Sequence, residues 1–420
     1  GVKEEEGEVE GAVEAGRMND VAGILVLLPP PPSLLKMLKT LNKPMLGGAK
    51  NLHLREGELH STIGRVLPVS EGDSITIDGS TGLVYRGEIP IVPAGHDESF
   101  QQVMGWADKH KRLQVHSEAV TDADVLTAHR WGAQGLLLHA EMLISQECLP
   151  ILQHALLTSD ILTSGNTSFL TSESKSQERA RVLGGLVRLW QGKYENLFRL
   201  MGDAKVIVRL LDRPLHLLLP DPRTPSFDKE VVGLSLRMGV ALDVVARRIA
   251  SLQEGRVVMG ARGCRLVVLL PEIAAAQTEA VVGAAIAINT QHPLKPHVIP
   301  RMQLPLLFSD HEADVVTGVV TAACDMVCAR EWARSGYQAP YIETRVLAEV
   351  STPRACMRAD RLSACHYTEG LCFDTLSLTQ LLLGMGGQES QPFMPLYLHH
   401  HLFPLSPFVS LDMGGVGAVL

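Results

Sequence analysis

Hydrophobic and polar positions divide the chain into two regions with different periodicities. Before residue 90 the apolar segments are short: Gly23–Val26 predicts a strand, and Leu34–Leu41 predicts a short helix. Apolar and polar residues alternate from Asp73 to Asp78, and the Gly-containing segment 79–82 then turns the chain into Leu83–Tyr85. The first region is therefore predicted to be a small α/β domain that ends in a β-hairpin.

From about Phe100 onward, strand-like and helix-like segments alternate. The candidate strands are Leu113–His116, Gly135–His139, Val206–Asp212, His297–Met302, Val346–Val350 and Leu371–Leu376, and helical stretches between them include Asp122–Trp131, Val240–Leu252 and Ala313–Ser335. An alternation of this length predicts a parallel β/α architecture, for which the (β/α)-barrel is the commonest single-sheet form. Because six strands are predicted rather than eight, the expected fold is an incomplete (β/α)8 TIM-type barrel.

The same patterns give the domain boundaries. Residues 1–15 are rich in Glu and Gly and predict a disordered acidic tail. The small, swivelling α/β domain is expected over residues 16–90, a linker over residues 91–112, and the truncated barrel over residues 113–420. Within the barrel, residues 157–178 are rich in Ser and Thr and predict a surface loop.

Composition narrows the classes of protein. The chain has 420 residues, 46% hydrophobic and 20% charged, which allows a large buried core. Its formal net charge of −8 argues against a nucleic-acid surface, which needs clustered basic residues. The apolar run Val21–Leu28 stops at four prolines and is too short to span a bilayer. No basic region precedes this run, so it makes a poor signal peptide. We therefore expect neither a nucleic-acid nor a membrane partner.

Seven cysteines are scattered along the chain without a CxxC pair. Cys324 and Cys328 lie four residues apart in a helical segment, and we interpret them as structural thiols rather than as a metal site. The odd number favours a reducing compartment, in the cytoplasm or in an organelle. The run His399–His401 is interpreted as a solvated loop, because adjacent side chains point in different directions on any regular element.

Several strings, in order and with matching spacing from about residue 16 onward, resemble one enzyme family. They are EGDSITIDGSTG at 71–82, RLLDRPLH at 209–216, GARGCRL at 260–266 followed by PEI at 271–273, LTQ at 378–380, SPF at 406–408 and GVG at 415–417. They resemble pyruvate, phosphate dikinase and its relatives, the phosphoenolpyruvate (PEP) synthases and enzyme I of the sugar phosphotransferase system. The resemblance implies a swivelling phosphohistidine domain, then a PEP/pyruvate-binding barrel, and phosphoryl transfer that interconverts pyruvate and PEP.

The resemblance implies that arginines bind the substrate. PEP carries a phosphate and a carboxylate, and guanidinium groups bind both in bidentate fashion. Arg209, at the carboxyl end of a predicted strand, matches a substrate arginine of the family; the alternative is an ion pair with Asp212 or Glu349. Arg262 and Arg265 match a pair that supports the substrate site from a neighbouring loop, with packing and ion pairing as the alternative.

The resemblance also implies one Mg²⁺ held by two carboxylates. Glu349 matches the first of them. The second carboxylate belongs to the family string FGTNDLTQ, and this chain has FDTLSLTQ instead, so Ser377 stands in place of the aspartate. In the same string, Thr375 matches a threonine that the resemblance assigns to substrate binding. Asp374 lies three residues earlier and would face the other side of a strand. Mg²⁺ binding without substrate is therefore not expected.

Catalytic groups that the resemblance implies are missing from the chain. The place of the phosphoryl-carrying histidine holds four prolines and Ser33, interpreted as a helix N-cap, and no histidine precedes His53. A second clamp arginine is absent from Leu138–Leu143, where His139 could donate a hydrogen bond, and a third is absent from Gly384–Gln388. The acid cysteine of the family's seventh strand has no counterpart in the six predicted strands.

These losses favour a catalytically inactive protein, a degenerate and C-terminally truncated copy. Loss of a single electrostatic group from such a site lowers the rate by ~10²–10³. One alternative is a non-catalytic partner that senses PEP or pyruvate through Arg209, or that forms a homodimer or a heterodimer with an intact dikinase through the barrel. Two others are a half-enzyme completed by a separate chain and an interaction protein without ligand binding. The two open edges of a six-stranded sheet would favour pairing with another chain.

Overall fold

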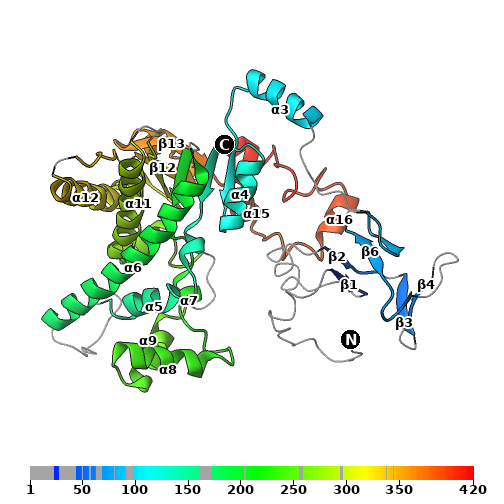
Figure 1. Ribbon diagram of the computed structural model, residues 1–420, viewed down its shortest axis with the longest axis horizontal. Helices are drawn as coiled ribbons and strands as arrows, with labels where there is room; N and C mark the ends of the chain where they lie inside the picture. Colours follow the sequence, from blue (N-terminus) through cyan, green and yellow to red (C-terminus); the bar gives the residue numbers. More distant parts are fainter. Residues whose placement is uncertain are drawn as a thin grey trace. The chain divides into compact units, whose positions relative to one another are not determined.

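A computed structural model of the chain describes residues 23–27, 44–49, 51–55, 58–62, 69–79, 81–90, 98–159, 172–202, 205–254, 259–293, 297–336, 338–343 and 345–420. The chain divides into two compact units, Gly1–His110 and Lys111–Leu420 (Figure 1). The predicted acidic tail 1–15 and the predicted helix Leu34–Leu41 lie outside the described residues.

The first unit contains three small sheets in its described residues. Strands β1 (Ile24–Val26) and β2 (Met45–Gly47) are parallel, strands β3 (Leu52–Arg55), β4 (Glu58–Ser61) and β5 (Val69–Ser70) form an antiparallel sheet, and strands β6 (Ile75–Asp78) and β7 (Leu83–Arg86) form an antiparallel pair. The strand at 23–26 and the hairpin at 73–85 are thus confirmed. Part of the predicted linker 91–112 forms helix α3 (Glu98–His110).

The second unit is built on one parallel sheet of six strands, in the order β13-β12-β11-β10-β9-β8. The strands are β8 (His116–Ala119), β9 (Gly135–Leu138), β10 (Lys205–Arg209), β11 (Arg301–Leu304), β12 (Arg345–Val350) and β13 (Thr368–Phe373). Neighbours in the sheet are neighbours in sequence, and a helix follows each strand. This is the topology of a (β/α)8-like barrel, so the predicted fold class is confirmed.

The second unit contains helices of very different lengths. They are α4 (Asp122–Arg130), η1 (Ala140–Leu143), α5 (Leu149–Leu157), α6 (Ser172–Met201), α7 (Leu215–Leu218), α8 (Phe227–Met238), α9 (Leu242–Leu252), α10 (Cys264–Leu269), α11 (Pro271–Gln291), α12 (Asp310–Arg334), α13 (Pro353–Cys356), α14 (Ala359–Ser363), α15 (Thr375–Leu383), α16 (Met394–His399) and α17 (Val416–Val419). The predicted loop 157–178 is helical at both ends, in α5 and α6, and residues 160–171 lie outside the described part.

Helix α11 lies at the centre of the hydrophobic core. It packs against α6 and α12, one on either side (Figure 1). Its many Ala residues and Gly283 allow these close contacts, and nearly every face of the helix is buried. Among the described residues it is the one helix long and apolar enough to cross a membrane, but 78% of its apolar window is buried in the unit, as in the core helix of a globular domain.

Four predicted strands have shifted boundaries. Residues 113–115 precede β8, residues 297–300 precede β11, and residues 210–212 follow the end of β10. Thr375–Leu376, expected to end the last strand, begin helix α15. The Asp374 side chain ends the extended segment because it accepts a hydrogen bond from the backbone N–H of Ser377 at 3.0 Å, which caps the helix. The expectation that Asp374 continues a strand and faces its opposite side is therefore wrong.

Candidate functional site

The carboxyl ends of the central strands bring together residues that are far apart in the sequence. Arg209 ends β10, Gln303 lies on β11, and Glu349 lies near the end of β12. Since β10, β11 and β12 are consecutive neighbours in the sheet, their side chains meet at one edge. We refer to this edge, together with the loops that follow β8 to β13, as the barrel mouth.

Arg209 is bound on two sides by carboxylates. Its Nε and Nη2 atoms donate to Oε2 and Oε1 of Glu349 at 2.7 and 2.9 Å, and Nη2 also lies 2.7 Å from Oδ2 of Asp212. Burial lowers the pKa of Arg209, but the bonds to Glu349 and the charge of Asp212 outweigh it, so the pKa lies above its ordinary value. Both structural alternatives for this arginine, pairing with Asp212 and pairing with Glu349, are realised together.

Glu349 has no acceptor site left for another ligand. Besides the two bonds from Arg209, its Oε2 accepts from Nε2 of Gln303 at 2.6 Å and its Oε1 accepts from the backbone N–H of Leu306 at 3.3 Å. An ionised carboxylate has about four acceptor sites, and all four are used here. The Glu349 side chain is only 2% exposed.

Arg262 is neutralised by a carboxylate that it shares with Arg209. Its Nε and Nη2 atoms donate to Oδ1 and Oδ2 of Asp212 at 2.8 and 2.6 Å, and this bidentate pair raises the pKa of Arg262. Arg265 instead donates to the carbonyl of Gly260 at 3.2 Å, within its own loop. Arg209 and Arg262 therefore meet at the barrel mouth, whereas Arg265 stabilises the neighbouring loop.

Gln277 on α11 positions the end of β10, and our sequence reading did not identify it. Its Nε2 donates to the carbonyl of Arg209 at 3.0 Å and to the hydroxyl of Tyr194 at 3.2 Å, while its Oε1 accepts from the backbone N–H of Leu211 at 3.0 Å. Gln277 is 1% exposed. An amide in the middle of an Ala-rich helix was the available signal, because a buried amide needs partners.

Gly263 allows the Arg262 loop to approach the barrel mouth. Its φ is +55°, and a Cβ atom there would lie 2.8 Å from the carbonyl oxygen of Pro305 and 2.9 Å from Oδ1 of Asp212. Only a residue without a side chain fits this backbone and this contact. The adjacent Cys264 N–H donates to the same Pro305 carbonyl at 3.0 Å, which anchors the loop to the end of β11.

Ser377 and Thr375 lie in the first turn of α15, after β13. The Ser377 hydroxyl donates to Oδ2 of Asp374 at 2.6 Å, so it serves the helix cap. Thr375 is exposed, and its carbonyl accepts from the hydroxyl of Thr379 at 2.7 Å. Burial and the charges of Glu349, Asp374 and Glu118 raise the pKa of Cys372, which places these acidic groups around the end of β13.

These residues do not fit a Mg²⁺ ion. In the part of the chain that the structure describes, no group of three or more His, Cys, Asp and Glu side chains is arranged to hold a metal. Glu349 is saturated by hydrogen bonds, and Ser377 supplies a hydroxyl that is already donating. Mg²⁺ prefers several oxygen ligands that include charged carboxylates, and at the two positions that match the family ligands one carboxylate is already bonded and the other is a hydroxyl.

Buried polar atoms without a hydrogen-bond partner gather at the same edge. Among the described residues these atoms include Nε2 of His139, Oε2 of Glu141, Oε1 of Gln303 and Oγ of Ser351, all close to strand ends. His139 lies between two carboxylates, with Nε2 3.6 Å from Glu118 and Nδ1 3.8 Å from Glu141. Such atoms are normally satisfied by water or by a small polar ligand.

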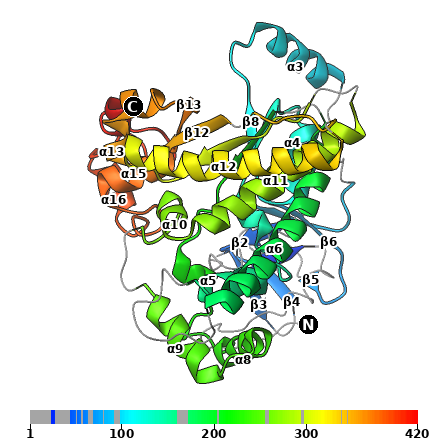
Figure 2. The ribbon, with the colours of Figure 1, turned by 90° about the vertical axis from the view of Figure 1, so that its left-hand side faces the viewer.

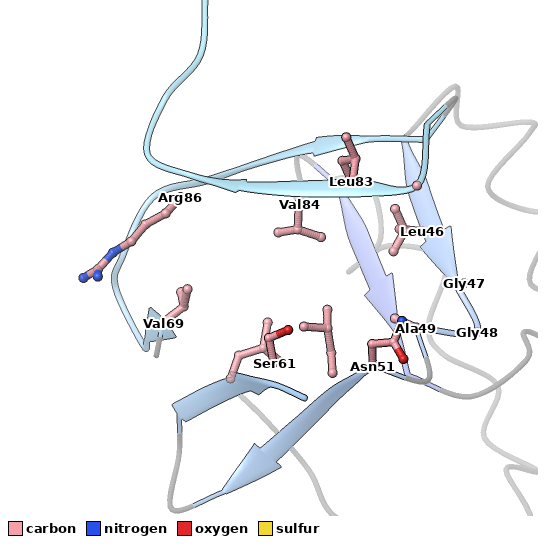
Figure 3. Close-up of a pocket in the computed structure, with 13 residues that line it drawn as sticks. Leu46, Gly47, Gly48, Ala49, Asn51, Ser61, Val69, Leu83, Val84 and Arg86 are labelled. Atoms are coloured by element: carbon pink, nitrogen blue, oxygen red, sulfur yellow. The ribbon is translucent and has the colours of Figure 1, made fainter. Parts of the chain in front are cut away.

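The first unit contains a cavity of about 620 Å³ (Figure 3). Its walls include apolar side chains such as Leu46, Leu83 and Val84, and Arg86 lies at one side (Figure 3). Arg86 donates to Oδ2 of Asp73 at 3.2 Å, so its charge is compensated. None of the predicted binding residues lies in this unit, and the cavity has no charged group directed at an anionic substrate among its described residues.

Comparison with known proteins gives one consistent result. Residues 95–409 match the family described as PEP-utilising enzyme, PEP-binding domain. The chain is 30% identical to the pyruvate, phosphate dikinase of Clostridium symbiosum over 351 residues, 84% of this chain and 37% of the relative. It is 29% identical to the pyruvate, phosphate dikinase of Rhizobium meliloti over 380 residues, which make up 90% of this chain and 39% of the relative. It is 30% identical to the chloroplastic pyruvate, phosphate dikinase of Mesembryanthemum crystallinum over 352 residues, which make up 84% of this chain and 34% of the relative. The chain thus spans less than half the length of these relatives.

Proposed function

Because this chain belongs to the family of PEP-utilising enzymes, we propose that it is a pyruvate, phosphate dikinase-like protein whose barrel no longer turns over PEP. In this proposal the substrate site is closed by ion pairs within the protein. Arg209 and Arg262, which match substrate-binding arginines, act as structural counterions of Asp212 and Glu349.

The saturation of Glu349 carries the proposal. The carboxylate expected to hold Mg²⁺ accepts four hydrogen bonds from Arg209, Gln303 and Leu306. To receive a metal it would have to exchange these bonds inside the protein, and Arg209 would then lose one of its two buried counterions. Leaving a buried charge without its partner typically destabilises a protein by about 3–5 kcal/mol.

The charge balance of the barrel mouth supports the same conclusion. Arg209 and Arg262 compensate Asp212 and Glu349, so these two arginines have no uncompensated charge left for a ligand. Glu118, Glu141 and Asp374 add further carboxylates around the strand ends. These carboxylates would repel a doubly anionic substrate, and low-dielectric surroundings strengthen that repulsion.

The phosphoryl relay is also affected. The first histidine of the chain is His53, and the place of the carrier loop holds four prolines and Ser33, which lie outside the described residues. A phosphoserine is a stable ester, whereas the family reaction needs a labile phosphoramidate of histidine. Loss of the relay and loss of the metal cage are independent reasons to expect no reaction.

The direct test is pyruvate formation from PEP, AMP and pyrophosphate with Mg²⁺, followed with lactate dehydrogenase. The C. symbiosum dikinase, assayed in parallel, is the positive control, and the chain is expected to remain at background. A Ser377→Asp variant should also remain at background, since Arg209 still occupies Glu349. Magnesium-dependent turnover by the unmodified chain would overturn the proposal.

A second function is favoured by one observation, the unpartnered polar atoms at the barrel mouth. They leave open a non-catalytic protein that senses PEP or pyruvate, or that pairs with an intact dikinase. PEP binding would raise the thermal midpoint of the chain, with inorganic phosphate at equal ionic strength as the control. We expect PEP and phosphate to have the same effect; a PEP-specific upward shift would instead support the sensing role.

A further inference from the structure

Helix α12 carries two cysteines on its buried side. Cys324 and Cys328 are one helical turn apart on α12, the long yellow helix of Figure 2, so their side chains belong to the same helix face. Both are thiols rather than half-cystines, and both sulfur atoms lie near the carbonyl oxygen of Ile342, at 3.3 Å for Cys324 and 3.8 Å for Cys328. The shared carbonyl keeps the two sulfur atoms close together.

A cavity opens beside this pair. Its volume is about 510 Å³, and it is lined by Asp325, Cys328, Ala329, Trp332, Ala339 and Tyr341. The hydroxyl of Tyr341 donates to Oδ1 of Asp325 at 3.1 Å and holds one wall in place. Trp332 and Tyr341 are 51% and 67% exposed, so the cavity can be entered from solvent between two aromatic side chains.

Cys324 activates the thiol of Cys328. A hydrogen bond with Cys324 lowers the pKa of Cys328 to about 7, against the opposing effects of burial and of the Asp325 charge. A substantial fraction of Cys328 is therefore thiolate at neutral pH. The thiolate is the form that binds soft metals and attacks electrophiles.

We propose that Cys324 and Cys328 form a two-sulfur binding site for a soft, thiophilic centre of the trivalent-arsenic class, entered through the cavity beside Trp332. Thiolates select soft centres, which distinguishes this site from one for Mg²⁺. No third His, Cys, Asp or Glu completes a metal cluster in the described part of the chain, so the centre must be satisfied by two sulfur atoms and by groups that it brings with it.

Binding of a monosubstituted arsenical balances without an oxidant. In phenylarsine oxide the arsenic is trivalent and stays so. Two As–S bonds form, the two thiol protons combine with the oxide oxygen, and one water molecule leaves. The phenyl ring remains on arsenic and has room in the cavity against the indole of Trp332.

The test uses phenylarsine oxide and the full chain. We expect one arsenical per chain by intact-mass measurement, a change in tryptophan fluorescence, and protection of Cys324 and Cys328 from iodoacetamide in mapped peptides. The adduct should resist an excess of a monothiol, since release then needs two As–S bonds to break, and it should be removed by 2,3-dimercaptopropanol. A monothiol that strips the arsenical readily would overturn the proposal.

Variants give the second arm of the test. Cys324→Ala and Cys328→Ala should each abolish the monothiol-resistant adduct, and Cys365→Ala, which removes a thiol elsewhere, should leave it unchanged. In Trp332→Phe the adduct should persist and the fluorescence change should fall. If protection maps to other cysteines, or if the adduct survives in both single variants, the two thiols are structural only, and this result leaves the proposed function untouched.

Discussion

The barrel mouth and the α12 cavity both gather groups that can bind a ligand, and they differ in what those groups already bind. At the barrel mouth, Asp212 and Glu349 are almost fully buried and bonded to Arg209 and Arg262. Beside α12, a thiol that lines a cavity is bonded only to weak partners. Arg209, Arg262 and Glu349, which match the family pattern, are thus already bonded to one another or to Asp212, whereas Cys328, to which the pattern assigns no role, lines a cavity.

The pKa values of two buried cysteines, Cys264 and Cys328, differ in the same way between the two regions. Burial, together with the charges of Glu312 and Glu349, raises the pKa of Cys264 well above its usual value. Hydrogen bonding with Cys324 lowers the pKa of Cys328 to about 7. Burial acts against the thiolate in both places, so the neighbouring groups decide whether a buried cysteine is inert or reactive.

The largest expected effect comes from opening the ion-pair network. Asp212→Ala leaves Arg209 and Arg262 without a shared counterion, and it should lower the free energy of unfolding by about 3–5 kcal/mol in urea titrations followed by circular dichroism. The control is Asp221→Ala, which breaks an exposed pair with Arg223 and should change stability little. Equal effects of the two substitutions would mean that the barrel mouth is not held by these charges.

The next effect tests the backbone clamp behind the barrel mouth. Gln277→Leu leaves the N–H of Leu211 and the carbonyl of Arg209 without their hydrogen-bond partner. Each unsatisfied buried group should lower the free energy of unfolding by about 1–3 kcal/mol. Asn289→Leu removes a similar clamp on Val298 and is the matched control. Both should destabilise the unit, but only Gln277→Leu should speed amide exchange in the 209–212 segment. Equal exchange in the two variants would contradict the positioning role.

A smaller effect concerns the glycine that lets the Arg262 loop approach the barrel mouth. Gly263→Ala brings a Cβ atom against Pro305 and Asp212 at φ +55° and ψ −136°, a backbone close to the region restricted to glycine, whereas Gly239 has φ +63°, ψ 29° and nothing within 4 Å. The left-handed backbone alone costs alanine about 1–2 kcal/mol, and at Gly263 the rarer backbone and overpacking of about 1–3 kcal/mol add to that cost. Gly263→Ala should therefore lower the thermal midpoint more than Gly239→Ala does. Identical midpoints would show that the loop can move away from Asp212.

The smallest effect leaves stability unchanged and concerns reactivity. The rate of iodoacetamide labelling at Cys328 should rise with pH and reach half of its maximum near pH 7, because the thiolate fraction increases as pH passes the pKa. Cys264 should remain unlabelled in the folded protein up to about pH 9. In Cys324→Ala the midpoint for Cys328 should move to higher pH. A Cys328 midpoint near the usual thiol value in the unmodified chain would remove the difference between the two regions.

Two strand boundaries could not be predicted because amide side chains, rather than a neighbouring strand, accept the backbone hydrogen bonds there. The N–H of Val115 donates to Oε1 of Gln134 at 2.8 Å, and the N–H of Val298 donates to Oδ1 of Asn289 at 2.8 Å. Both segments contain apolar residues beside a strand, a local pattern that predicts a longer strand. Whether an extended backbone bonds to a strand or to an amide side chain depends on contacts distant in sequence.

The sequence by itself determined the β/α alternation, the six strands and their parallel arrangement, because burial periodicity is a local property of the chain. The family resemblance also predicted that Arg209, Arg262 and Glu349 belong to one site. Only the tertiary structure decided that Arg209 binds Glu349, 140 positions away, and that Gln277 fixes the backbone of Arg209 and Leu211. A charged side chain has the chemistry to bind either a ligand or a buried partner. Which of them it binds depends on the side chains that the fold places on the neighbouring strands.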